Sequence, residues 1–329
     1  MDKKEIIQHL NSNNPTQLHK KADKIRKEYC GDQVHLRGII EFSNYCEKDC
    51  FYCGLRKSNK KITRYRISNQ EILESAKKAA RLGYKTIVLQ SGEDSFYSTD
   101  DICQIIKSIK DNFDLAVTLS IGEKEYADYL KFKKSGADRY LLKFETSNRK
   151  LFKKLKPDSD FNLRIERIRW LKQMGFQVGS GNIVGLPNQS IQDLADDIVM
   201  IDQLDLDMVG VGPFIPHPQT PLSKSKLGTL DLVLKIISLL RIITKNTHLP
   251  ATTAVGSIDK TGRQKALRAG ANVLMPNVTP REYRKYYEIY PNKICVEENP
   301  LDCKSCIARM VKMLNRKIGL GYGHSLKNK

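Results

Sequence analysis

The chain lacks any long apolar run. Its most apolar segment, residues 230–243, is interrupted by Asp231, Lys235 and Arg241 and falls short of the roughly 18 residues that suggest a membrane span. The first five residues, Met1 to Glu5, are polar and lack the apolar core of a signal peptide. We therefore expect a cytoplasmic protein that makes no membrane contact.

The chain also lacks an organised basic motif, although its formal net charge is +19. The lysines are scattered, and no basic stretch is interleaved with aromatic residues. A lysine-rich solvated surface is the interpretation we favour, and it predicts no nucleic-acid partner. A metal-stabilised RNA-binding protein, attracted to phosphates, is the alternative. We expect the basic tail from Lys312 to Lys329 to be loosely held.

Cysteine is present at eight positions, and in a cytoplasmic chain this favours metal ligation over disulfides. Cys30 and Cys103 stand alone, and Cys103 lies in an apolar helical pattern that predicts a buried thiol. The other six cysteines form two groups. The first group is Cys46, Cys50 and Cys53, and the second is Cys295, Cys303 and Cys306.

The spacing Cys-x3-Cys-x2-Cys of Cys46, Cys50 and Cys53 offers three thiolates to one metal centre. Zinc would need a fourth ligand, such as His35 or a later cysteine, because a structural zinc ion is bound by four protein side chains. A cubane iron–sulfur cluster held by three cysteines instead leaves one iron without a protein ligand. This open position predicts a catalytic site.

The second group, spaced Cys-x7-Cys-x2-Cys, admits three interpretations. It could be a small zinc site, three incidental thiols, or the ligand set of an auxiliary [2Fe-2S] or [4Fe-4S] cluster. We favour the auxiliary cluster, because three cysteines lie within twelve residues of a chain that has few elsewhere.

A weak internal repeat predicts the fold. Four times a helical pattern ends in glycine, at residues 83, 136, 175 and 270, and a short apolar run follows. We expect strands at residues 34–42, 86–90, 115–119, 139–143, 176–179, 207–212, 250–253 and 272–275. We expect helices between them at residues 69–82, 100–110, 124–134, 162–174, 191–204, 230–244 and 262–269.

Eight strand–helix units without a linker predict an α/β fold, a (β/α)8 TIM barrel. A doubly wound open sheet is the alternative. Residues 1–30 are expected to form a helical lead-in, residues 31–276 the barrel, and residues 277–329 a C-terminal extension that carries the second cysteine group. In such a barrel the chemistry lies at the carboxyl ends of the strands. Polar residues expected there are Ser91, Glu93, Thr118, Ser120, Lys143, Glu145, Asn182, His217, Thr252 and Thr253.

The first cysteine group, with Tyr52 before its third cysteine, resembles the signature of the radical S-adenosylmethionine (SAM) superfamily. That resemblance implies a [4Fe-4S] cluster whose open iron binds SAM, and reductive cleavage of SAM to methionine and a 5′-deoxyadenosyl radical. Ser91-Gly92-Glu93 resembles the superfamily motif that binds the amino group of SAM. The run from Gly181 to Gly185, which contains Ile183, resembles the motif that packs on adenine.

Within the superfamily, the chain resembles the HydE family of [FeFe]-hydrogenase maturases over nearly its whole length. The similarity lies in the runs Tyr52 to Arg56, Thr86 to Asp94, Ala137 to Leu142, Met208 to Pro218, Pro250 to Ala254, Met275 to Asn277 and Tyr290 to Cys306. It implies that Glu145 binds the ribose of SAM and that Arg164 pairs with its carboxylate. It also implies a substrate cavity lined by Thr118, Lys143, Met275, Tyr287 and Tyr290.

The same resemblance implies the substrate and the partners. The substrate would be an organometallic complex, a cysteine-ligated iron carrying carbonyl and cyanide that HydG makes, and the product would be passed to HydF. An electron donor is also implied. In this family the auxiliary cluster is variable and dispensable. Lys143 departs from the family pattern, which has arginine at this position. An ammonium is not a planar guanidinium, so it would bind a carboxylate differently, although the positive charge is kept.

Two related enzymes are the alternatives within the superfamily. Biotin synthase needs ligands for a second cluster inside the barrel, and the strand-end cysteines for it are absent, since Cys103 lies in a predicted helix. Methylornithine synthase would not be expected to carry Cys295, Cys303 and Cys306.

Overall fold

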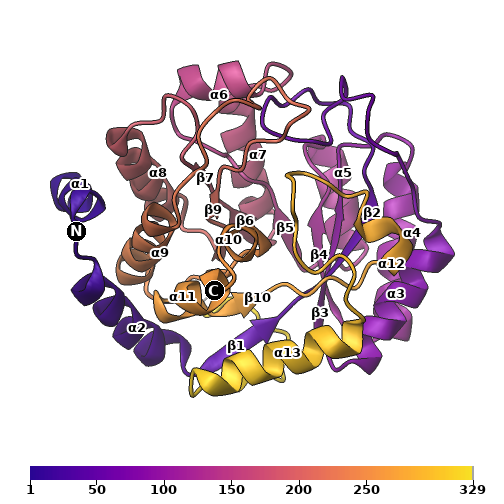
Figure 1. Cartoon of the computed structure of the whole chain (residues 1–329). Helices are drawn as coiled ribbons and strands as arrows, with labels where there is room; N and C mark the ends of the chain where they lie inside the picture. The colour runs from indigo at the N-terminus through magenta and orange to yellow at the C-terminus, as the bar shows by residue number, and fades with distance from the viewer. Residues whose placement is uncertain (328–329) are drawn as a thin grey trace.

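Parallel strands form a barrel in the computed structural model, which describes residues 1–327 (Figure 1). Six strands make one continuous parallel sheet in the order β2-β3-β4-β5-β6-β8, with side chains such as Ile40, Ile87 and Leu119 buried in the core. The strands of this sheet are β2 (Gly38–Ser43), β3 (Thr86–Ser91), β4 (Ala116–Ser120), β5 (Arg139–Leu141), β6 (Gln177–Ser180) and β8 (Met208–Val209).

The barrel is closed by shorter pairings. β1 (Gln33–Leu36) precedes β2 and pairs in parallel with β10 (Val273–Leu274), and Ile39 of β2 bridges to Asn277. Between β8 and β10, His248 bridges to Met208 and Pro250 bridges to Val273. The predicted (β/α)8 barrel is therefore confirmed. Its seventh strand is reduced to these bridges, because Thr252 already caps the next helix.

The helices that cover the barrel lie where the sequence predicts them, with ends shifted by a residue or two. Each of several helices begins with a reciprocal cap, as at α3, where Ser68 accepts from the Glu71 N–H and the Glu71 carboxylate accepts from the Ser68 N–H. The predicted helices are α3 (Asn69–Arg81), α4 (Thr99–Asn112), α5 (Tyr126–Lys134), α7 (Phe161–Gln173), α8 (Ile191–Leu204), α9 (Leu230–Thr244) and α11 (Gly262–Arg268).

Several elements were not predicted, since they lie in segments without a clear apolar period. They are α6 (Arg149–Leu155), α10 (Thr253–Ile258), α12 (Arg281–Arg284), α13 (Pro300–Met313), and the two-stranded parallel pair of β7 (Ile183–Val184) with β9 (Gly212–Pro213). Two helices precede the barrel, α1 (Lys3–Asn11) and α2 (Thr16–Cys30), and α2 packs along α9. Among the described residues, none of the helices has both the length and the apolar character to span a bilayer.

Residues 317–324 are part of the barrel base, so the expectation of a loose tail is wrong for them, and residues 328 and 329 lie outside the described residues. β11 (Lys317–Ile318) pairs in parallel with β1. Beyond it, the Tyr322 carbonyl accepts hydrogen bonds from Thr86 and Arg139, and the His324 carbonyl lies 2.8 Å from a ring nitrogen of His248. This tail closes the end of the barrel opposite the predicted mouth. The domain boundaries at residues 30 and 276 stay a prediction.

Candidate active site

A cavity of about 400 Å³ opens at the carboxyl ends of the barrel strands. It collects side chains from almost every strand end, as parallel strands in a barrel require. The sequence-predicted residues that line it are Cys46, Cys50, Tyr52, Cys53, Ser91, Gly92, Glu93, Ser120, Lys143, Glu145, Arg164, Ile183, Thr252, Thr253, Met275, Tyr287 and Tyr290.

The three cysteines lie on the loop that follows β2, and backbone contacts hold this loop against its neighbours. The Phe51 N–H donates to the Leu155 carbonyl of α6 at 2.9 Å, and the Gly54 N–H donates to the Ile289 carbonyl at 3.0 Å. Burial raises the pKa of Cys46 and Cys53, so both thiols hold their protons until a metal displaces them.

The three thiols are not arranged around one point. Within residues 1–327, no group of three histidine, cysteine or acidic side chains has the geometry to hold a single metal ion. A cubane cluster differs from a lone zinc ion because each of its cysteines binds a different iron atom. The donor set of three soft thiols on one cavity wall therefore fits an iron–sulfur cluster.

Two glycines shape the wall beside the cysteines. A Cβ at Gly92 would overlap the Tyr45 carbonyl, and it would lie 2.8 Å from the Cβ of Cys46. Gly122 has φ +82°, and a Cβ there would overlap the side chain of Glu93. Glycine is thus needed at both places for the β3 loop to reach the cysteine loop and for Glu93 to point into the cavity.

Glu145 lies at the centre of the polar wall and has an unusual backbone. Its φ is +67°, a left-handed conformation that is strained for a residue other than glycine. Hydrogen bonds on both sides hold it there, since its N–H donates to the Gly181 carbonyl and its carbonyl accepts from Ile183. Its Oε2 lies 3.1 Å from the Lys143 ammonium, yet it accepts no well-aligned hydrogen bond from a described residue. Burial would raise the pKa of Glu145, but Lys143 and Lys156 lower it, so the carboxylate is ionised.

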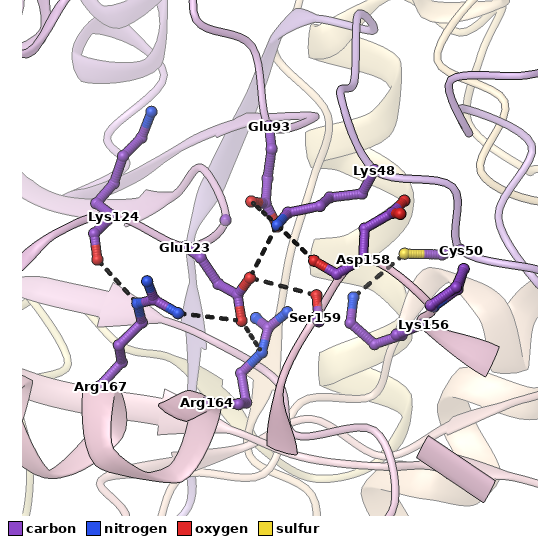
Figure 2. A network of polar contacts seen from close by, with 12 residues as sticks. Lys48, Cys50, Glu93, Glu123, Lys124, Lys156, Asp158, Ser159, Arg164 and Arg167 are labelled. Carbon is purple, nitrogen blue, oxygen red and sulfur yellow. Dashed lines mark hydrogen bonds and ion pairs between the residues drawn. The ribbon is translucent and has the colours of Figure 1, made fainter. Parts of the chain in front are cut away.

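Arg164, on α7, forms a buried charge network with Glu123 (Figure 2). Its Nε lies 2.9 Å from Glu123 Oε1, and the two side chains are buried, with exposed fractions of 4% and 5%. Its Nη2 is buried and has no hydrogen-bond partner among the described residues. Lys48 reaches the same network, with its ammonium 3.2 Å from Glu123 and 3.8 Å from Glu93. Arg164 therefore has one edge fixed and one edge available to a bound carboxylate.

Glu123 and Lys156 belong to this site but were not predicted. Glu123 follows Gly122 after β4, as Glu93 follows Gly92 after β3, so the repeated Gly-Glu pair was a signal that could have found it. Lys156 lies in a lysine-rich segment with no such signal. Its buried ammonium is 3.2 Å from Cys50 Sγ (Figure 2). The same ammonium is 3.5 Å from the Tyr52 hydroxyl.

A second buried ion pair lies on the opposite wall, and it was also missed. The Lys293 ammonium is 2.5 Å from Glu41 Oε1, and the Asn277 amide donates to the other oxygen of Glu41. The same ammonium donates to the Tyr287 carbonyl at 3.3 Å. Both Glu41 and Lys293 line the cavity beside Tyr287 and Tyr290.

Four of the residues expected at the mouth are not among those that line the cavity: Thr118, Asn182, Gly185 and His217. Asn182 is buried and donates to the Asp197 carboxylate at 2.9 Å, and His217 is buried with its Nε2 3.9 Å from Glu288 Oε2.

Thr118 lies two residues before Ser120 on β4, one layer deeper, and its side chain lines a separate void of about 10 Å³ with Arg37 and Arg139. Gly185 has φ +87°, and a Cβ there would lie 2.5 Å from the Cα of Gly228. Its role in the structure is this close backbone approach to Gly228.

The second cysteine group lies away from the cavity. The thiols of Cys295 and Cys303 hydrogen-bond to each other, which lowers the pKa of Cys295 to about 6 and raises that of Cys303. Cys303 and Cys306 are on α13, where Cys303 is buried and Cys306 is exposed. None of the three lines the mouth.

Comparison with known proteins agrees with this geometry. A model of the radical SAM superfamily matches residues 40–201. The chain is 51% identical to the [FeFe] hydrogenase maturase subunit HydE of Thermotoga maritima, over 93% of this chain and 88% of the relative. It is 32% identical to the 3-methylornithine synthase of Methanosarcina acetivorans, over 89% of this chain and 82% of the relative.

Solved structures show the same fold. The crystal structure of methylornithine synthase (PylB) superimposes with a TM-score of 0.84 at 28% identity, covering 97% of this chain and 94% of that one. HydG from Carboxydothermus hydrogenoformans matches with a TM-score of 0.79 at 21% identity, covering 95% of this chain and 75% of that one. The chain is therefore an enzyme that belongs to the radical SAM superfamily, whose members bind a [4Fe-4S] cluster and SAM.

Proposed function

We propose that this enzyme is a HydE-type maturase, which acts in the assembly of the [FeFe]-hydrogenase active-site cluster. The observation that carries the proposal is the 51% identity to HydE of Thermotoga maritima over 93% of the chain. The mouth cavity supports it, because three thiols and the unpartnered edges of Glu145 and Arg164 face one space.

In this proposal Cys46, Cys50 and Cys53 hold the [4Fe-4S] cluster. When bound, the cluster supplies one electron to SAM, and the sulfonium C–S bond breaks to give methionine and a 5′-deoxyadenosyl radical. The fit rests on the donor set, since soft thiolates are the preferred ligands of iron–sulfur clusters. The barrel positions the reacting groups and excludes water from them.

The polar wall is suited to SAM. Arg164 would bind the methionine carboxylate through its free Nη2, since a guanidinium forms strong charge-assisted bonds to carboxylates. Glu93 and the Ser91-Gly92 backbone would receive the amino group, and Glu145 the ribose hydroxyls. Tyr52 and Ile183 would pack on the remaining apolar surface. Gly185 would shape this motif through its close approach to Gly228.

The second substrate would occupy the rest of the cavity. Met275, Tyr287 and Tyr290 supply an apolar and hydroxylic wall, and Lys143 and Lys293 supply positive charge. These groups suit a small anionic complex, such as a cysteine-ligated iron that carries carbonyl and cyanide. Thr118 would act on this substrate only through Ser120, which lies between it and the mouth. An electron donor, HydG as the source of the substrate and HydF as the acceptor of the product are the proposed partners, in the cytoplasm.

Cys295, Cys303 and Cys306 are proposed to hold an auxiliary cluster, [2Fe-2S] or [4Fe-4S], that the reaction does not need. The contact between the Cys295 and Cys303 thiols supports a shared metal site there, because soft thiolates are the preferred ligands of iron–sulfur clusters.

A second candidate function is 3-methylornithine synthesis. The 32% identity to the Methanosarcina acetivorans enzyme over 89% of the chain and the PylB superposition favour it. The second cysteine group favours the maturase, since methylornithine synthase is not expected to carry these cysteines.

The experiment that tests the proposal has two stages. The protein is first reconstituted anaerobically with iron and sulfide, then given dithionite and SAM, and 5′-deoxyadenosine is measured. It is then assayed with the synthetic cysteine-ligated iron carbonyl cyanide complex and, separately, with lysine. Deoxyadenosine formation stimulated by the iron complex supports the maturase. Conversion of lysine to methylornithine instead would support the second candidate.

A further inference from the structure

The chain segment after Glu145 is tied to α8, one of the helices on the outside of the barrel (Figure 1). Asp197 of α8 accepts two hydrogen bonds on its Oδ1 atom, from the N–H and from the hydroxyl of Ser147, both at 2.6 Å. Asp193, one turn earlier on the same face of the helix, accepts from the Asn148 amide at 2.9 Å. Two carboxylates of one helix face therefore hold the residues that follow Glu145.

The other carboxylate oxygen of Asp197 reaches the next strand end. Its Oδ2 accepts from the Asn182 amide at 2.9 Å, and Asn182 in turn forms a parallel β-bridge with Glu145. Asn182 directly precedes Ile183, which lines the cavity. One carboxylate thus ties together the two strand ends that carry Glu145 and Ile183, although Asp197 does not line the cavity itself.

Glu145 needs such support because it is the central residue of a strained turn. The Thr146 N–H donates to the Phe144 carbonyl at 2.9 Å, and the φ of Glu145 is +67°. A three-residue turn with a positive central φ is the rare and strained form of the γ-turn. Backbone strain of this kind persists only where the surrounding contacts impose it. Asp197 supplies such a contact, because it holds the chain at Ser147, where the chain leaves the turn.

The burial of Asp197 also indicates a specific role. Its exposed fraction is 0%, and its charged neighbour on α8, Asp193, has the same sign of charge. A carboxylate taken out of water costs free energy unless hydrogen bonds compensate for the lost hydration. The three hydrogen bonds that Asp197 accepts come from Ser147 and Asn182, the residues that flank Glu145 on its own chain segment and on the adjacent one. The compensation therefore comes from the turn that Asp197 holds.

We propose that Asp197 is a positioning residue for SAM, which fixes the turn at Glu145 and so directs the Glu145 carboxylate to the ribose hydroxyls. This inference rests on the proposed function, which gives that carboxylate the ribose. Asp197 lies outside the cavity and acts only through Ser147 and Asn182. Its effect should therefore fall on the adenosine half of SAM and spare the carboxylate that Arg164 binds.

The test measures binding without turnover. The full chain is reconstituted anaerobically with iron and sulfide and kept oxidised, and calorimetry gives the Kd for S-adenosylhomocysteine and for its 2′,3′-dideoxyribose analogue. The wild type should bind the analogue more weakly by about tenfold or more, because the analogue lacks the hydroxyls that bond to the Glu145 carboxylate. Glu145→Ala should bind the two ligands within about twofold of each other, which sets the ratio expected when this contact is missing.

The ratio of the two Kd values separates positioning from a simple loss of stability. Asp197→Ala should lower the ratio to about threefold or less. Asp197→Asn should keep it at about tenfold, since asparagine can still accept from Ser147 and can pair with the Asn182 amide. A purely structural role would weaken the binding of both ligands equally and leave the ratio unchanged. If Asp197→Ala does not fold, Ser147→Ala, at a partly exposed position, should lower the ratio by about threefold.

A second measurement needs no cluster. Hydrogen–deuterium exchange of the apoprotein in residues 144–148 should be about tenfold faster in Asp197→Ala than in the wild type, because the Ser147 N–H loses its acceptor. The matched control is Asp196→Ala, which removes the neighbouring carboxylate of α8 that pairs with Lys3 at 2.5 Å. This control should leave both the exchange and the ratio as they are in the wild type.

Three results would overturn the proposal. They are a wild-type Kd ratio in Asp197→Ala, wild-type exchange in residues 144–148 of that variant, and equal effects of Asp196→Ala and Asp197→Ala. A different result would refute the proposed function at this site. If the wild type itself binds the two ligands equally, as Glu145→Ala is expected to do, then Glu145 does not bind the ribose, whatever the exchange shows.

Discussion

The ammonium of Lys156 lies 3.2 Å from Cys50 Sγ, and both side chains are buried. Burial alone would lower the pKa of Lys156, but the negative charges of Cys50, Glu145 and Glu93 raise it. A positive charge is therefore fixed beside one of the three cluster cysteines, in a place where water does not screen it.

Replacing Lys156 by Met should lower the reduction midpoint of the reconstituted cluster. Methionine keeps the length and the packing but removes the positive charge, and the reduced cluster carries one more negative charge than the oxidised one. We expect a fall of about 60 mV or more, which for one electron corresponds to about 1.4 kcal/mol. A redox titration followed by electron paramagnetic resonance measures it. Lys154→Met, an exposed neighbour, is the control, and equal midpoints in all three proteins would contradict the prediction.

The two cysteine groups should differ in their effect on SAM cleavage. Cys50→Ala removes a ligand at the mouth and should abolish deoxyadenosine formation, together with most of the iron bound there. Cys303→Ala, remote from the mouth, should leave the rate within about twofold while lowering total iron. Iron content and deoxyadenosine are measured on the same samples. If both variants lose activity equally, the assignment of the catalytic role to the first group is wrong.

Gly122→Ala should weaken SAM binding, because the added Cβ would overlap Glu93. Gly83→Ala is a matched control, since Gly83 has φ +79° against +82° for Gly122 but no neighbour within 4 Å of an added Cβ. Both variants should lose about 1–2 kcal/mol of stability from the left-handed backbone. A rise of tenfold or more (about 1.4 kcal/mol) in the Kd for SAM is expected for Gly122→Ala alone. Calorimetry on the reconstituted proteins measures both quantities, and a normal Kd in Gly122→Ala would refute the role of this glycine.

Asp197 should make the apoprotein less stable as the pH rises from about 4 to about 6. Its buried carboxyl accepts from the Ser147 N–H and hydroxyl, both at 2.6 Å, and from the Asn182 amide at 2.9 Å. Burial raises its pKa from 3.8 to about 6. The folded state therefore binds the proton more tightly than the unfolded state, and the stability that this proton contributes is lost as the pH passes through that range.

The measurement is the difference in unfolding free energy between the wild type and Asp197→Asn. Asparagine carries no ionisable proton, and Asn182 can present its unpartnered Oδ1 to the new amide. Relative to the variant, the wild type should lose about 2 kcal/mol between pH 4 and pH 6, which is most of the total that a pKa shift of about two units contributes. A difference that does not change with pH would show that Asp197 keeps an ordinary pKa.

The order of elements in the barrel was predictable, because its signals are local. Gly83, Gly136 and Gly175 end helices in a left-handed conformation, and apolar runs follow them. The replacement of the seventh strand by single bridges was not predictable from such signals. The apolar run at Pro250 is short, and Thr252 caps a helix that begins at once.

Site residues that belong to a sequence motif were predictable. Residues whose place depends on depth in the barrel, or on the reach of one long side chain, were not. Thr118 and Ser120 both point inward on β4, but sequence alternation cannot tell which of them reaches the mouth. Lys156 is one lysine among several in its segment, and only the packing of α6 against the cysteine loop brings its ammonium to Cys50.

The sequence by itself determined the alternation of strands and helices and the three-cysteine motif, since both depend on residues close together in the chain. The tertiary structure decided which charges meet, as when Arg164 pairs with Glu123 and Lys293 with Glu41. It also decided that the C-terminal tail closes the barrel base, through hydrogen bonds from Arg139 and Thr86. These contacts join residues tens to hundreds of positions apart, and their distances are fixed only when the barrel closes.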